Sequence, residues 1–124
     1  MSHEIPDKMY REHLIELYKS PNNYGVLEKP SAKGTETNAN CGDEITIELL
    51  VKDGIVEDAK FNGSGCVMSI VSASMLTDKI KGMKVSYVKA LDRNDVFELM
   101  KVKLSPARIK CVLLPLEALR KALK

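Results

Sequence analysis

The chain has 124 residues and a formal net charge of +2 at neutral pH, with 44% hydrophobic and 29% charged residues. This size and balance are typical of a soluble globular domain, and we expect residues 1–124 to form a single domain. The interspersed charges exclude a basic nucleic-acid-binding stripe, and no apolar run is long enough to span a bilayer. The first residues lack the pattern of a secretory signal, so we expect a cytoplasmic, reducing compartment.

The N-terminal part of the chain predicts an amphipathic helix over residues 6–19. Its apolar side chains recur on one face at helical spacing: Tyr10, Leu14, Leu17 and Tyr18. The turn-forming residues 20–25 end this helix. Residues 26–40 are predicted to form a loop that contains a short edge strand near residues 35–37.

A β-hairpin is predicted next, because residues 44–51 alternate between apolar and polar side chains. Asp53 and Gly54 are a strong signal for a two-residue turn, and residues 55–61 return as the second strand. The apolar faces match best with a one-residue slip or bulge in the register. A glycine-rich loop follows the hairpin and leads to Cys66.

Three helices are predicted in the second half of the chain. Residues 67–81 form the first, which has unusually small side chains, and residues 95–100 form a shorter one. The third contains the leucines of the C-terminal segment. Because proline is tolerated only in the first turn of a helix, Pro115 predicts that this last helix begins close to Cys111.

Two cysteines and an aspartate converge at the open end of the predicted hairpin. With a two-residue turn, Cys41 lies opposite Cys66 or within about a residue of it, whichever register the strands take. Asp43 follows Cys41 by two residues, so its side chain leaves an extended strand on the same face. Helix starts predicted at Cys66 and Cys111 favour the thiolate, which is the nucleophilic and metal-binding form of cysteine.

Simpler interpretations exist for each of these residues. Three scattered cysteines are about as often inert buried thiols, and a single aspartate at Asp43 is more often a turn or cap residue. Two cysteines at helix starts favour reactive or metal-binding sulfurs instead. Three cysteines with one aspartate are unusual for a structural zinc site. One hard oxygen among soft sulfurs weakens the hold on an iron–sulfur unit, which suits a site that releases its contents.

The same residues carry a family likeness. The chain contains C-G-D at 41–43, G-S-G-C-V-M-S at 63–69 and A-R-I-K-C at 107–111. This combination resembles the U-type iron–sulfur cluster scaffold family, IscU and SufU, over essentially the whole chain. The resemblance implies an α+β fold, with a small antiparallel sheet of about three strands and helices packed on one face. It also identifies the metal and cluster ligands: Cys41, Asp43, Cys66 and Cys111.

The function implied by the resemblance is that of a non-enzymatic scaffold. Such a protein accepts sulfur from a partner cysteine desulfurase on Cys111 or Cys41, and builds a labile [2Fe–2S] cluster. It then passes the cluster to apo-proteins, and a homodimer linked by the cluster is compatible with this role. The alternative is a zinc-dependent sulfurtransferase of the SufU type, in which Zn²⁺ occupies the same four residues. Neither function needs nucleic acid or a membrane.

The branch of the family is left open by the segment around the last cysteine. Lys110 stands where the IscU branch has a histidine, and in this the chain resembles SufU. However, SufU-like chains carry an insertion between the mid-chain helix and the final cysteine, and the corresponding segment is short here.

Overall fold

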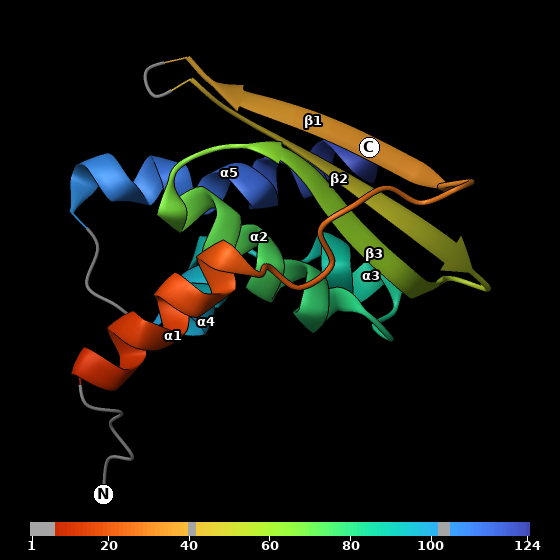
Figure 1. Ribbon diagram of the computed structural model, residues 1–124. Coiled ribbons are helices and arrows are strands. Elements are labelled where there is room, and N and C mark those ends of the chain that lie inside the picture. The colour runs from red at the N-terminus through yellow and green to blue at the C-terminus, as the bar shows by residue number, and fades with distance from the viewer. Residues whose placement is uncertain (1–6, 40–41, 102–104) are drawn as a thin grey trace, which may run out of the picture.

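Three strands and five helices make up the described part of the chain, which covers residues 7–39, 42–101 and 105–124 of the computed structural model. In chain order these elements are α1 (Asp7–Lys19), β1 (Ala32–Asn38), β2 (Asp43–Lys52), β3 (Ile55–Ser64), α2 (Val67–Ile80), α3 (Val85–Lys89), α4 (Arg93–Met100) and α5 (Pro106–Ala122). The strands form an antiparallel sheet in the order β1-β2-β3. Helices α2 and α5 lie against one face of it, with α1 and α4 beyond them (Figure 1). This arrangement confirms the predicted α+β fold.

The β2–β3 hairpin turns at the predicted residues. Asp53 and Gly54 both have positive φ angles, 54° and 76°, as a tight hairpin turn of the primed type requires. The register shifts by one residue at an irregularity close to the turn, and beyond it Ile47 pairs with Phe61. The inward side chains of both strands are fully buried in the core: Ile45, Ile47, Leu49, Ala59 and Phe61.

Helix α5 crosses the sheet at a point where β1 has no side chain. A Cβ atom on Gly34 would lie 2.3 Å from the carbonyl oxygen of Ala118 and 2.3 Å from the backbone nitrogen of Ala122. Glycine on the strand and alanines on the helix therefore allow the two backbones to approach closely. Beside this contact, Lys121 Nζ lies 3.2 Å from Glu36 Oε1. The Thr37 backbone N–H and the Lys121 ammonium hold the pKa of Glu36 below its ordinary value.

The prediction that α5 begins close to Cys111 is wrong. The helix begins at Pro106, with Pro115 in its interior, so Cys111 lies in the second turn of the helix. Pro115 has no N–H to donate to the Cys111 carbonyl four residues earlier. The Ser69 hydroxyl lies 3.1 Å from that carbonyl oxygen, and the Ser72 hydroxyl donates to the Val112 carbonyl at 2.6 Å. Side chains of α2 thus contact the Cys111 carbonyl, which Pro115 leaves without its helical donor, and the neighbouring Val112 carbonyl.

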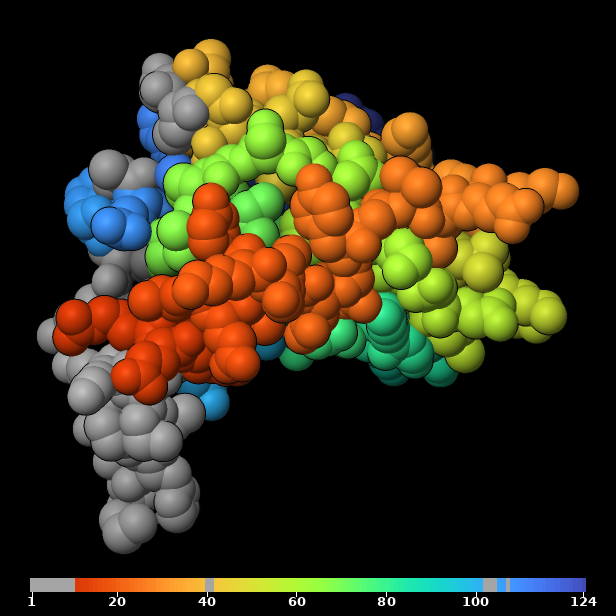
Figure 2. Space-filling model, in the orientation of Figure 1, coloured from red at the N-terminus to blue at the C-terminus, as the bar shows by residue number. Residues whose placement is uncertain are grey.

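The predicted apolar face of α1 is only partly correct. Leu14 is buried, but Tyr18 is 43% exposed and Ile15, on the same helix, is 49% exposed. The Tyr10 side chain lies outside the described residues. Figure 2 shows α1 and the segment that follows it running across one face of the molecule toward β1. Among the described residues, no helix is both long and apolar enough to cross a membrane.

Three elements differ in extent from their prediction. The edge strand predicted near residues 35–37 is the longer β1, and the second hairpin strand continues through the glycine-rich loop as far as Ser64. The helix predicted at 95–100 begins two residues earlier, after a capping box formed by Asp92 and Asp95. Helix α3 was not predicted, and it has five residues.

Candidate metal centre

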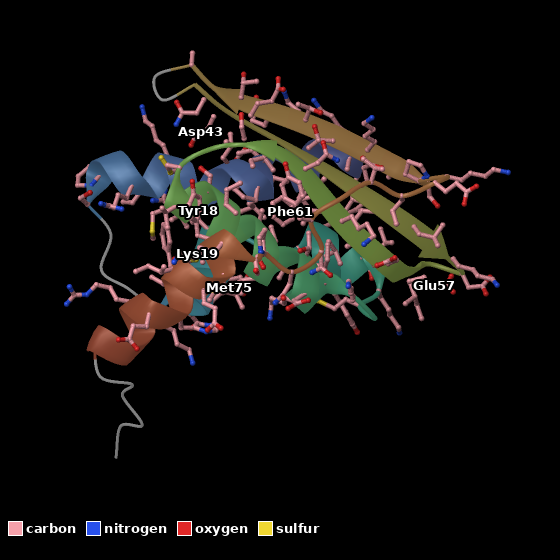
Figure 3. The ribbon with its side chains drawn as sticks, in the orientation of Figure 1. Tyr18, Lys19, Asp43, Glu57, Phe61 and Met75 are labelled. Carbon is pink, nitrogen blue, oxygen red and sulfur yellow. The ribbon has the colours of Figure 1, made fainter. Side chains whose placement is uncertain are left out.

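Asp43 is the first residue of β2, and its side chain is buried at the end of the sheet. It pairs in register with Asn38 on β1, and only 4% of the residue is exposed. Figure 3 shows it at the end of the hairpin away from Glu57, which lies toward the turn. The open end of the hairpin is therefore where the sequence predicted that this carboxylate would lie. Cys41, the nearest cysteine in sequence, lies outside the described residues.

Cys66 occupies the N-cap position of α2, as predicted. Its backbone is extended, with φ −70° and ψ 170°, and its carbonyl accepts the first helical hydrogen bond from the Ile70 N–H at 3.1 Å. The thiol is partly exposed. Its place at the start of the helix and its exposure leave the sulfur open to an incoming partner or a metal ion.

Cys111 reaches the same place from α5. It is 7% exposed, and its carbonyl is bound by α2 through Ser69. The prediction that Cys111 lies at a helix start is wrong, because α5 begins five residues earlier at Pro106. The side chains of Arg108 and Lys110 are exposed to solvent.

The structure brings together three of the four candidate ligands. One carboxylate oxygen of Asp43 and the sulfur atoms of Cys66 and Cys111 all lie within 4.8 Å of one another. A Zn–S bond is about 2.3 Å, so small side-chain movements are enough to place these atoms around one ion. The three residues come from a strand, a helix cap and a helix interior, so the tertiary fold assembles the centre.

The charge of this cluster fits a cation. Among the described residues, the salt bridges involve other carboxylates, and the Asp43 side chain accepts a hydrogen bond from the neutral Ser69 hydroxyl. Burying a carboxylate without a compensating positive charge is unfavourable. Two sulfurs and one oxygen are a donor set that suits zinc or iron. The residues present therefore fit a thiophilic metal ion.

Two residues at the centre were missed by the sequence analysis. Ser69 is fully buried, and its hydroxyl lies 2.7 Å from Asp43 Oδ2 and 3.6 Å from Cys66 Sγ. Gly65 packs against the same carboxylate, since a Cβ there would lie 3.2 Å from Asp43 Cγ. One pattern in the sequence could have identified Ser69: it carries a hydroxyl one helical turn after Cys66. The small side chains of this helix were instead interpreted only as a sign of close packing.

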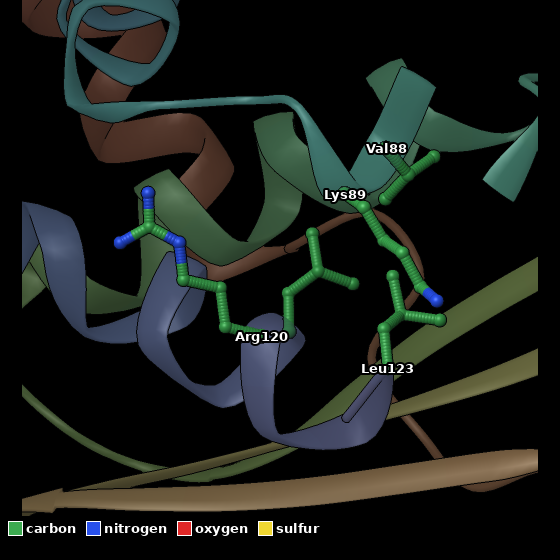
Figure 4. A pocket seen from close by; sticks show the side chains of 5 residues that line it. Val88, Lys89, Arg120 and Leu123 are labelled. Carbon is green, nitrogen blue, oxygen red and sulfur yellow. The ribbon is translucent and has the colours of Figure 1, made fainter. Parts of the chain in front are cut away.

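A second hollow lies elsewhere on the molecule. It is found where α3 meets the last turns of α5, and Figure 4 shows its lining: Val88, Lys89, Leu119, Arg120 and Leu123. These aliphatic and basic side chains offer no thiol, imidazole or carboxylate to a metal. The metal-binding chemistry of the described residues is therefore concentrated at the other end of α5, around Cys111.

Comparison with known proteins places the chain in a family. The profile of the NifU-like N terminal domain matches residues 9–124. The chain is 38% identical to the zinc-dependent sulfurtransferase SufU of Bacillus subtilis, over 93% of this chain and 89% of SufU. It is 36% identical to the iron–sulfur cluster assembly scaffold protein IscU of Thermotoga maritima, over 94% of this chain and 93% of IscU.

Solved structures give the same result. A Fervidobacterium islandicum protein, described as a proposed iron–sulfur cluster assembly scaffold for the SUF system, superposes with a TM-score of 0.77 at 27% identity, over 97% of this chain and 100% of that one. The N-terminal part of a NifU-like protein from Brucella abortus shares the fold, with a TM-score of 0.72 at 19% identity over 94% of this chain and 93% of that one. The chain therefore belongs to the NifU-like N-terminal domain family, the iron–sulfur cluster assembly scaffold family that includes proteins named IscU and SufU.

Proposed function

We propose that this protein is a scaffold on which a labile [2Fe–2S] cluster is assembled and from which it is passed to apo-proteins. Cys41, Asp43, Cys66 and Cys111 hold this cargo. The observation that carries the proposal is the convergence of Asp43, Cys66 and Cys111 within 4.8 Å, with the carboxylate buried and without a cationic partner among the described residues. Family membership supports the same role.

The mixed donor set supports release rather than storage. Thiolates hold iron–sulfur units strongly, whereas a carboxylate oxygen is a hard ligand with weaker affinity for such a unit. Asp43 is thus the ligand that exchanges most readily. Cys66 is partly exposed at the same centre, so an incoming protein can reach the cargo from that side.

Sulfur delivery requires a partner desulfurase that carries a cysteine persulfide. A thiolate of this chain attacks the outer sulfur, the S–S bond of the donor breaks, and the donor cysteine leaves as a thiolate. The acceptor is then a persulfide, and no net electron transfer has occurred. Cys111 and Cys41 are the candidate acceptors; Cys111 lies beside the other ligands, and Cys41 lies outside the described residues.

Cluster assembly also has an electron requirement. Converting two sulfane sulfurs to two sulfides consumes four electrons, and oxidation of two ferrous ions to ferric ions supplies two of them. A protein or small-molecule reductant must supply the other two. The scaffold itself contributes ligands and position.

A zinc-dependent sulfurtransferase is the second candidate. It is favoured by the 38% identity to Bacillus subtilis SufU, which bears that name, and by Lys110, which cannot ligate a metal while it is protonated. In this alternative Zn²⁺ holds the four residues at rest, and one thiolate is displaced to accept sulfur.

Purification without oxygen distinguishes the two candidates. Iron with acid-labile sulfide, or a cluster formed on reconstitution with ferrous iron, cysteine, a desulfurase and a reductant, supports the scaffold. Stoichiometric zinc with no cluster on reconstitution supports the sulfurtransferase. Cys66→Ser is the control, since it removes one ligand from the partly exposed rim of the centre. A protein that binds neither metal nor cluster would contradict both proposals.

A further inference from the structure

Ser69 lies at the middle of the candidate centre without being one of its candidate ligands. It is a buried residue in the first turn of α2, 0% exposed. Its Oγ is 2.7 Å from Asp43 Oδ2, 3.1 Å from the Cys111 carbonyl oxygen and 3.6 Å from Cys66 Sγ. One hydroxyl therefore contacts all three described members of the cluster.

The number of protons on this hydroxyl limits what it does. A serine hydroxyl has one proton to donate, so it donates to the Asp43 carboxylate or to the Cys111 carbonyl, not fully to both. The contact to Asp43 is shorter, and hydrogen bonds to a charged acceptor are the stronger ones. The Ser69 hydroxyl therefore donates its hydrogen bond mainly to the Asp43 carboxylate, and its contact with the Cys111 carbonyl is the weaker one.

We propose that Ser69 is a positioning residue for metal binding: it holds Asp43 Oδ2 so that the carboxylate offers its remaining oxygen to the metal. The inference rests on the proposed metal-holding role of the centre. A hydrogen bond to one carboxylate oxygen fixes the rotation of the group and favours binding through a single oxygen. Outer partners of this kind orient metal ligands and contribute substantially to affinity.

Helix α2 supplies a matched comparison one turn further on. Ser72 is 1% exposed, and its hydroxyl donates to the Val112 carbonyl of α5 at 2.6 Å. Ser69 and Ser72 thus both contact a carbonyl of α5 near the same proline. Only Ser69 also reaches the Asp43 carboxylate. Replacing each by alanine separates packing of the two helices from orientation of the ligand.

The test measures Zn²⁺ affinity of the metal-free chain by competition with a chromophoric chelator, together with the absorption spectrum of the Co²⁺ form. We expect Ser69→Ala to weaken Zn²⁺ binding by about 10- to 100-fold and to change the Co²⁺ spectrum. Ser72→Ala should change the affinity by less than about threefold, despite a similar loss of stability in urea. Ser69→Thr keeps the hydroxyl and should retain most of the affinity.

Several outcomes would overturn the proposal. Equal losses of Zn²⁺ affinity in Ser69→Ala and Ser72→Ala would mean that both serines act only by joining the helices. In an Asp43→Ala background, Ser69→Ala should have little further effect, so an undiminished effect there would show that Ser69 does not act through Asp43. Wild-type protein that binds neither Zn²⁺ nor Co²⁺ would instead refute the proposed function itself.

A measurement on the wild-type chain covers the case in which Ser69→Ala does not fold. The infrared difference between Zn²⁺-loaded and metal-free protein, assigned with Asp43→Ala, gives the splitting of the Asp43 carboxylate stretches. A wide splitting indicates binding through one oxygen and is the expected result. A narrow splitting indicates that both oxygens bind the metal, which would contradict the proposal that Ser69 leaves one oxygen for the metal.

Discussion

Replacing Gly65 by alanine is expected to weaken metal binding more than it weakens the fold. A Cβ at this position would lie 3.1 Å from Ser69 Cβ and 3.2 Å from Asp43 Cγ, whereas ordinary contacts are 3.4–4 Å. The neighbours must therefore move by a few tenths of an ångström. Ser69 Cβ is fixed to helix α2, so much of the displacement falls on the Asp43 carboxylate.

The magnitudes follow from this small displacement. Overpacking a buried site costs about 1–3 kcal/mol, and a contact short by a few tenths of an ångström belongs near the lower limit. A shift of a few tenths of an ångström uses up much of the roughly 0.5 Å within which a metal ligand must be placed, so we expect Zn²⁺ binding to weaken about tenfold, equivalent to about 1.4 kcal/mol. The assays are chelator competition for affinity and urea unfolding of the metal-free chain for stability.

An Asp43→Ala background provides the control. With the carboxylate removed, Gly65→Ala should cost little further Zn²⁺ affinity, because no Asp43 ligand is left for the methyl group to displace. The reasoning is refuted if Gly65→Ala binds Zn²⁺ as tightly as the wild type. It is also refuted if the same loss appears when the Asp43 carboxylate is absent.

Three further predictions concern the fold and the ligands. Gly34→Ala should destabilise the protein by about 3 kcal/mol or more in urea unfolding, because its Cβ meets backbone atoms of α5 at 2.3 Å; wild-type stability would show that the close approach is not required. Cys66→Ser and Cys111→Ser should each lose stable metal or cluster binding while keeping the circular dichroism of the wild type, since the core and not the metal supplies most of the folding energy; unfolding of both would indicate a structural metal. Asp43→Ala should slow cluster transfer to an apo-protein, because the exchangeable oxygen ligand is lost, and transfer at the wild-type rate would contradict that role.

The convergence of Asp43 with Cys66 could be predicted because it depends on local rules. Asp53 and Gly54 fix the hairpin turn, and the turn fixes which residues meet at the open end to within one position. The helix of small residues after Cys66 could also be predicted, because both the glycine-rich loop before it and its composition are local features of the sequence.

The place of Cys111 could not be predicted in the same way. Local rules disfavour a proline in a helix interior, yet Pro115 lies inside α5, and the Ser69 and Ser72 hydroxyls of another helix contact carbonyls near it. These contacts join residues about forty positions apart in sequence, and no local sequence pattern predicts them. Helix α3 was missed for a similar reason: it is short, and its preceding segment is set by backbone hydrogen bonds of Met83 and Val85 with the β2–β3 hairpin.

The dispersed origin of the centre ties metal capture to the order in which the chain folds. Asp43 and Ser69 are 26 residues apart, and Ser69 and Cys111 are 42 residues apart, so each contact closes a long loop. Such contacts form late, because their chain entropy must be offset by packing that is already in place. During synthesis, α5 leaves the ribosome after every other described element, and until it docks on α2 the cluster lacks Cys111. A nascent or partly folded chain therefore holds Asp43, Cys66 and Cys111 apart, and we expect the proposed metal site to be complete only after α5 has docked on α2.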